Sequence, residues 1–253
     1  MTTHLTLHPD IVTFPDPHTL CLDAAYRLIA LAAAKTRSGG VFSVALAGGR
    51  TPAMLYTDLA ELPLRTTIDW EKVHLFFGDD RFVEPESDFS NYRLANDSLI
   101  SKVPIPLENV HRIKTEMKDI EEARNLYETD LRSFFSTPYP RFDLILLGMG
   151  EDGHCASLFP GKAALQETSS WVTVSEPGLK PFVPRITVTY PVLNHARNLL
   201  FMVAGADKAE ALQKVMEGPF DPDNLPSQKV SPIDGSHTWL IDAPASRLLK
   251  KVS

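Results

Sequence analysis

The sequence has only two cysteines, Cys21 and Cys155, which lie far apart in a chain of 253 residues. Two distant cysteines make neither a disulfide framework nor the paired spacing of a zinc site, and they favour a reducing compartment. No apolar run approaches the roughly 20 residues that a membrane helix needs. The first residues, MTTHLTLHPDIVTFPDP, lack a basic region followed by an apolar stretch, so we expect no secretory signal and a cytoplasmic protein.

Positive charge is also scarce, because 25 Lys and Arg face 32 Asp and Glu, which gives a net charge of −7. This balance argues against a general nucleic-acid surface, which needs a basic face. It leaves room for a small anionic ligand, which needs only a few local cations. The chain also lacks internal repeats and low-complexity tracts. We therefore predict a single domain over residues 1–253, a monomer or weak dimer, with a small-molecule ligand and neither a nucleic-acid nor a membrane partner.

The chain does contain a regular alternation of helical and strand patterns. Helices are expected over 19–35, from about 51 to 62, over 90–101 and 120–135, and from about 208. Strands are expected over 41–47, 73–77, 142–147, 171–174, 185–190, 199–204 and 238–241, with 217–235 as a surface excursion. This alternation predicts an α/β fold with a mostly parallel sheet. Ligands bind such sheets beyond the carboxyl ends of the strands, so the loops after residues 47, 77, 147 and 204 are the candidate site.

The first of these loops, LAGGRTP, places Gly48 and Gly49 before a helix, with Thr51 as the expected N-cap and Pro52 at the first helical position. Free N–H groups at a helix N-terminus bind anions, most commonly phosphate. The alternative is a tight turn that needs Gly48 only for packing. The loop lacks the Gly-Lys-Ser/Thr ending of a nucleotide P-loop, so ATP is not implied.

Charged side chains follow the second strand, and others occur at the start of one later strand and after another. Asp79, Asp80 and Arg81 are expected in a long polar loop, where carboxylates can serve acid–base or metal chemistry and the arginine can hold an anion or an oxyanion. The alternative is an exposed loop whose charges neutralise one another. Arg185 opens a strand and Lys208 lies in AGADKAEAL. Both are either surface charges or ligands of the anion at the glycine loop.

The third loop, GMGEDGHCASLFPG, contains a literal G-x-G-x-x-G after a strand. A dinucleotide site would also need a helix of three turns or more. Pro160 and Gly161 would end that helix seven residues after Gly153, so we predict that no nucleotide binds here.

Asp152 and His154 in this loop suit hydrolysis better. A histidine can take a proton from water at neutral pH, and a neighbouring carboxylate can orient its ring. The alternative is a histidine that only bonds to its own loop. We do not expect Cys155 to act as a nucleophile beside His154, because adjacent side chains diverge.

Together, LAGGRTP, FFGDDRFVEPESDFSNYRLA, FDLILLGMGEDGHCASLFPG, PRITVTYPVLNHA and VAGADKAEAL resemble the 6-phosphogluconolactonase family in order and spacing. The resemblance implies the fold shared with glucosamine-6-phosphate isomerase/deaminase, a Rossmann-like open sheet with helices on both faces and no nucleotide. It also implies hydrolysis of 6-phospho-D-glucono-1,5-lactone to 6-phosphogluconate, the second step of the oxidative pentose phosphate pathway. Neither a metal nor another cofactor is implied.

The same resemblance assigns roles to individual residues. It makes His154 the general base, with Asp152 and Arg81 as the other catalytic residues. The residues it places around the lactone and phosphate are Gly48, Gly49, Arg50, Asp79, Asn91, Arg185 and Lys208. The family usually has Asp-Glu-Arg where this chain has Asp79-Asp80-Arg81, which leaves the role of Asp80 open.

Two functions other than lactone hydrolysis remain possible for a protein with this fold. Glucosamine-6-phosphate deaminases share the GxGxDGH pattern but continue with an asparagine-glutamate-proline segment where this chain has SLFPG. They also carry a tyrosine in place of Arg81. A non-catalytic sugar-phosphate sensor would not require a base, so the presence of both Asp152 and His154 argues against it.

Overall fold

The structure, a computed structural model that describes residues 9–250, is built around a seven-stranded sheet in which every neighbouring pair is parallel. In spatial order the strands are β1 (Asp10–Phe14), β10 (Ser236–Asp242), β9 (Asn198–Val203), β6 (Leu144–Leu147), β2 (Phe42–Leu46), β3 (Val73–Phe77) and β5 (Val110–His111). From β2 the chain adds strands in one direction, and from β6 in the other. The switch point between β2 and β6 is where open α/β sheets bind ligands.

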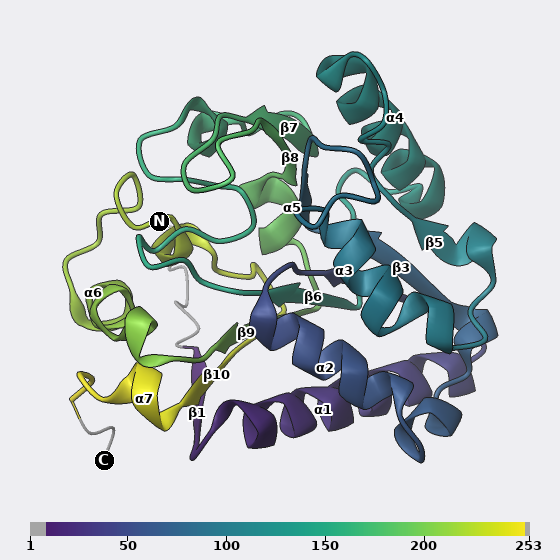
Figure 1. Cartoon of the computed structure of the whole chain (residues 1–253), viewed down its shortest axis with the longest axis horizontal. Coiled ribbons are helices and arrows are strands. Elements are labelled where there is room, and N and C mark those ends of the chain that lie inside the picture. The colour runs from purple at the N-terminus through teal and green to yellow at the C-terminus, as the bar shows by residue number, and fades with distance from the viewer. Residues whose placement is uncertain (1–8, 251–253) are drawn as a thin grey trace.

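Helices cover both faces of this sheet, as expected (Figure 1). They are α1 (Pro17–Arg37), α2 (Arg50–Ala60), α3 (Asn91–Ser98), α4 (Ile120–Phe135), α5 (Tyr190–Asn194), α6 (Ala209–Glu217) and α7 (Ala243–Ser246). In Figure 1, α1 and α2 run along one side of the sheet, and α4 lies on the other. Phe134 of α4 packs edge-on against Phe76 of β3. No helix within residues 9–250 is long and apolar enough to cross a membrane.

The local signals read from the sequence account for most of these elements. Asp16 caps α1 by accepting from the Thr19 N–H at 2.9 Å, and Pro17 is the first helical residue, two residues before the start expected from the apolar pattern. All five residues of β2 are buried, which fits a strand covered on both faces. The expected N-cap at Thr51 is wrong: α2 begins at Arg50 and Gly49 takes the cap position.

A second, antiparallel sheet was not expected. It consists of β4 (Asp79–Arg81), β8 (Arg185–Val188) and β7 (Val172–Ser175). The sequence placed residues 79–81 in a loop, and this is wrong. Asp and Arg have no strand preference of their own, so pairing with β8 decides their conformation.

One further correction concerns the edges of the main sheet. The edge strands β1 and β5 were not predicted, and both complete the main sheet.

The segment 217–235 lies mostly at the surface, as expected, but it contains a short 3₁₀ helix, Pro226–Lys229, in which Pro226 and Ser227 are buried. The Ser227 N–H donates to the Gly153 carbonyl at 3.0 Å, so this segment supports the loop after β6.

Candidate active site

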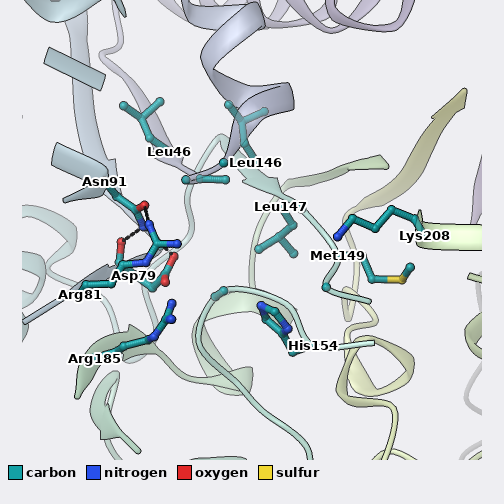
Figure 2. A pocket seen from close by; sticks show the side chains of 17 residues that line it. Leu46, Asp79, Arg81, Asn91, Leu146, Leu147, Met149, His154, Arg185 and Lys208 are labelled. Carbon is teal, nitrogen blue, oxygen red and sulfur yellow. Dashed lines mark hydrogen bonds between the residues drawn. The ribbon is translucent and has the colours of Figure 1, made fainter. Parts of the chain in front are cut away.

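A cavity of about 230 Å³ opens at the switch point, beyond the carboxyl ends of β2, β3, β6 and β9 (Figure 2). All four loops singled out in the sequence contribute to its walls. Every predicted site residue lines it except Arg50 and Asp152. Parallel strands end at one edge of the sheet, which explains how residues more than 100 positions apart meet here.

His154 reaches the cavity from the turn after β6, and Asp152 stands behind it. The two side chains are joined by a hydrogen bond of 2.5 Å between His154 Nδ1 and Asp152 Oδ1. Burial opposes ionisation of Asp152, but the bonds and charge of His154 outweigh it and keep the pKa of this carboxyl below its ordinary value. Because Nδ1 is engaged, Nε2 is the nitrogen left for chemistry in the cavity.

The glycines of this turn make room for that pair. A Cβ added at Gly150 would overlap the His154 ring and lie 2.5 Å from Asp152 Oδ1. Gly153 has a φ of +80°, a left-handed conformation that favours glycine. The described residues 148–171 contain one short 3₁₀ helix, Ala163–Gln166, and no α-helix. The predicted absence of a dinucleotide-type helix is confirmed.

His154 is the base predicted from the sequence, so replacing Gly150 by Ala should displace it and lower kcat for the predicted lactone substrate by about 100-fold, a loss that misplacing a reacting group by about 1 Å can cause. Gly148→Ala is the matched comparison, because a Cβ there has no heavy atom within 4 Å. It should retain far more activity. Steady-state kinetics and thermal unfolding of both variants test this, and a Gly150→Ala enzyme with wild-type kcat would contradict it.

The two neighbouring carboxylates after β3, Asp79 and Asp80, lie in different environments. Asp80 is buried and does not line the cavity. Its carboxylate accepts from the backbone N–H groups of Asn91 at 2.7 Å, Arg81 at 2.8 Å and Tyr92 at 3.0 Å. Burial raises the pKa of Asp80 to about 6, while these N–H groups act in the opposite direction. Asp80 holds the start of α3 in place.

Asp79, in contrast, lines the cavity and takes part in a series of hydrogen bonds from Ser157 through Asn91 to Arg81. Its Oδ2 accepts from Ser157 Oγ at 2.6 Å, and its backbone carbonyl accepts from Asn91 Nδ2 at 2.9 Å. Asn91 Oδ1 in turn accepts from Arg81 Nη1. A Cβ at Gly48 would overlap the Asn91 amide, so Gly48 is needed for this close approach. This series of hydrogen bonds links the His154 loop to the guanidinium of Arg81.

Two arginines face the cavity side by side. Arg81 and Arg185 are cross-strand partners in β4 and β8, an arrangement that is unfavourable for like charges. Arg185 is 3% exposed, and burial lowers its pKa, with the Asp79 carboxylate acting against this. Within residues 9–250, the buried Nε atoms of both arginines lack a hydrogen-bond partner. Such a pair is suited to an anionic ligand.

Lys208 supplies a third cation from a different direction. Figure 2 shows it across His154 from Arg81 and Arg185. Its Nζ lies 3.6 Å from Asp207 Oδ2 and 3.9 Å from Glu151 Oε1. The two arginines therefore lie on one side of the histidine and Lys208 on the other.

The N-terminus of α2 forms another wall of the cavity. The N-cap residue, Gly49, has no side chain that could accept a hydrogen bond. The first N–H groups of the helix therefore have no side-chain cap. Arg50 does not line the cavity. Its side chain is 93% exposed, and Nη2 lies 3.9 Å from Asp207 Oδ2.

A cysteine nucleophile has little support in the residues present. Cys155 is fully buried, does not line the cavity, and has its pKa raised to about 12 by burial. Within residues 9–250, no group of three or more His, Cys, Asp or Glu side chains is arranged to hold a metal ion.

The sequence matches the family described as “Glucosamine-6-phosphate isomerases/6-phosphogluconolactonase” over residues 15–239. The chain belongs to this family. A Synechocystis sp. relative named 6-phosphogluconolactonase is 41% identical over 214 residues, which cover 83% of this chain and 86% of the relative. A rice relative (Oryza sativa subsp. indica) named “Probable 6-phosphogluconolactonase 4, chloroplastic” is 38% identical over 95% of this chain and 77% of its own.

Solved structures of the family agree with this fold. The 6-phosphogluconolactonase from Trypanosoma cruzi has a TM-score of 0.87 at 27% identity and covers 98% of this chain and 100% of its own. A monomeric glucosamine-6-phosphate deaminase has a TM-score of 0.80 at 20% identity, covering 94% of this chain and 99% of its own, and this likeness shows the fold alone. The predicted family and the predicted Rossmann-like α/β fold are confirmed.

Sequence reasoning missed several residues that complete the site. Met149 and Ala156 line the cavity, and Ser157 bonds to Asp79. Ala156 has a φ of +48°, an uncommon conformation for a residue other than glycine. All three residues lie inside the GMGEDGHCASLFPG motif, which was the one feature of the sequence that could have indicated them. Their individual roles depend on contacts with distant parts of the chain.

Proposed function

We propose that the protein hydrolyses 6-phospho-D-glucono-1,5-lactone to 6-phosphogluconate, the second step of the oxidative pentose phosphate pathway. The observation that carries this proposal is the position of His154, which is hydrogen-bonded to Asp152 and lies between Arg81 and Arg185 on one side and Lys208 on the other. The product has two anionic ends, a phosphate and a carboxylate. A cavity with cations on both sides of a base suits such a molecule.

In the first step, His154 Nε2 takes a proton from water as the water oxygen forms a bond to the lactone C1. Asp152 accepts from the Nδ1 side and stabilises the imidazolium that forms. The carbonyl oxygen of the lactone becomes an oxyanion, which Arg81 and Arg185 stabilise.

In the second step, the tetrahedral intermediate collapses and the bond between C1 and the ring oxygen breaks. The protonated His154 gives its proton to the departing ring oxygen, so one group serves first as base and then as acid. The carboxylic acid formed at C1 still carries the second proton of the water and loses it to solvent. The resulting carboxylate stays beside Arg81 and Arg185, whose planar guanidinium groups can bind it in a bidentate manner. No covalent intermediate with the enzyme forms.

This proposal assigns the two predicted phosphate ligands, Arg185 and Lys208, to different ends of the substrate. Arg185 and Lys208 were expected to hold the phosphate together, but they lie on different sides of His154. We assign the phosphate to Lys208 and the N-terminus of α2, where Gly48 and Gly49 line the cavity. Arg185 joins Arg81 at the lactone end. The two ends of the substrate then lie on either side of the base.

The proposed activity is tested by supplying the purified protein with the phosphorylated lactone and, separately, with glucosamine 6-phosphate. We expect 6-phosphogluconate from the first, at a rate well above spontaneous opening of the lactone, and no ammonia from the second. Ammonia release would favour the deaminase alternative. Binding of either compound without turnover would favour a sugar-phosphate sensor.

Dialysis against a strong chelator should leave lactonase activity intact. The carboxylates near the cavity are engaged by hydrogen bonds, Asp79 with Ser157 and Asp152 with His154. Activity before and after dialysis is the measurement. Loss of activity that one divalent ion restores would instead make these aspartates metal ligands.

A single domain over the whole chain, a cytoplasmic location and a monomeric or weakly dimeric state stay predictions. Size-exclusion chromatography with light scattering tests the oligomeric state. Fractionation of the native cells tests the location, which matters because the rice relative carries “chloroplastic” in its name.

A further inference from the structure

Phe159 contacts two functional side chains of the cavity that lie on different elements. Its ring centroid lies 4.4 Å from that of His154, with an angle of 42° between the planes. The guanidinium carbon of Arg185 lies over the same ring, 5.0 Å from its centroid. Phe159 itself is 1% exposed and does not line the cavity. The ring therefore joins the base to a cation without reaching the substrate.

We propose that Phe159 is a positioning residue that fixes the His154 base and the Arg185 guanidinium relative to each other. The inference rests on the proposed lactonase function, in which these two groups act on the same carbonyl group. His154 lies in the loop after β6 and Arg185 in strand β8, and the two share no direct hydrogen bond among the described residues. Phe159 contacts both, so its ring can set their separation.

Arg185 has few other restraints. Among the described residues, its guanidinium donates one hydrogen bond, from Nη2 to the Leu179 carbonyl at 3.1 Å, and its Nε has no partner. A cation over an aromatic face is attracted by the negative charge of that face. The ring of Phe159 therefore supplies a directional contact that aliphatic packing would not.

The ring is held in place from the β7–β8 connection. A Cβ added at Gly178 would overlap three carbon atoms of Phe159, so the backbone of that connection lies directly against the side chain. The next residue, Leu179, provides the carbonyl that binds Arg185. Ring, connection and guanidinium form one packed unit, and His154 contacts this unit through the ring.

Fluorination of Phe159 separates this role from simple core packing. Site-specific incorporation of 4-fluoro-, 3,5-difluoro- and 3,4,5-trifluorophenylalanine weakens the charge of the ring face while changing its shape little. We expect kcat/KM to fall stepwise along the series, by about 2- to 30-fold in total. Thermal stability should change little. The matched control is the same series at Phe142, a fully buried residue just before β6, at the end of that strand remote from the cavity.

A second readout does not depend on turnover. In the free protein, ¹⁵N NMR signals of the His154 ring and of Arg185 Nε–H should both move in Phe159→Leu and stay unchanged in Phe142→Leu. If the wild type fails to hydrolyse the lactone, the proposed function is wrong, and these signals still test the positioning role. Unchanged signals together with unchanged kcat/KM in the fluorinated series would overturn the inference.

Discussion

Replacing His154 by Asn should lower kcat for the phosphorylated lactone by about 10²- to 10⁴-fold, the range expected when a general base is removed. The fold should persist, because the residue lies in a loop and its ring is held mainly by Asp152 and Phe159. Asn cannot take a proton from water at neutral pH. Binding of 6-phosphogluconate should change less than kcat, since the cations on both sides of the histidine are untouched.

The measurement is initial-rate kinetics with the spontaneous opening of the lactone subtracted. His18→Asn is a suitable control, since His18 is exposed on α1 and does not line the cavity. A His154→Asn enzyme with near wild-type turnover would remove His154 from the mechanism, whatever the control shows.

Lys208→Ala should mainly raise KM and lower kcat/KM for the phosphorylated lactone by about 10- to 150-fold. A charge-assisted contact to phosphate is worth roughly 1.5–3 kcal/mol, which converts to that range. The phosphate takes no part in the reaction, so its contacts are similar in the ground state and the transition state and affect binding more than kcat. Unphosphorylated glucono-1,5-lactone should be affected little.

Two other variants complete this comparison. Lys214→Ala removes an exposed lysine of α6 that does not line the cavity, and it should leave both substrates unaffected. Arg81→Ala removes a cation from the proposed lactone end and should lower kcat for both lactones. Equal losses on both lactones for Lys208→Ala would show that this lysine is not the phosphate ligand.

The sequence was sufficient to predict the parts of the fold that local signals determine. Asp16 and Pro17 mark the start of α1, and the mostly apolar residues of β2 and the wholly apolar residues of β6 mark the centre of a parallel sheet. Because the carboxyl ends of parallel strands meet at one edge, the four candidate loops could be placed together from topology alone. The pairing of Asp152 with His154 followed from their separation of two residues in a glycine-rich turn.

Features that depend on distant contacts were beyond the sequence. Asp79, Asp80 and Arg81 become a strand only because β8 pairs with them, and alternation along that strand sends Asp79 and Asp80 to different partners. The position of Lys208 across His154 from Arg185 likewise depends on where β9, which precedes Lys208, and β8, which contains Arg185, lie in the two sheets. Composition gives no information on either point.

A crystal structure with 6-phosphogluconate bound tests the central claim most directly. The account predicts the product in the cavity at the switch point, with its carboxylate against Arg81 and Arg185 and its phosphate at Lys208. Its C1 should lie within hydrogen-bonding reach, through one water, of His154 Nε2. A product bound elsewhere, or one whose C1 lies remote from His154, would contradict the account.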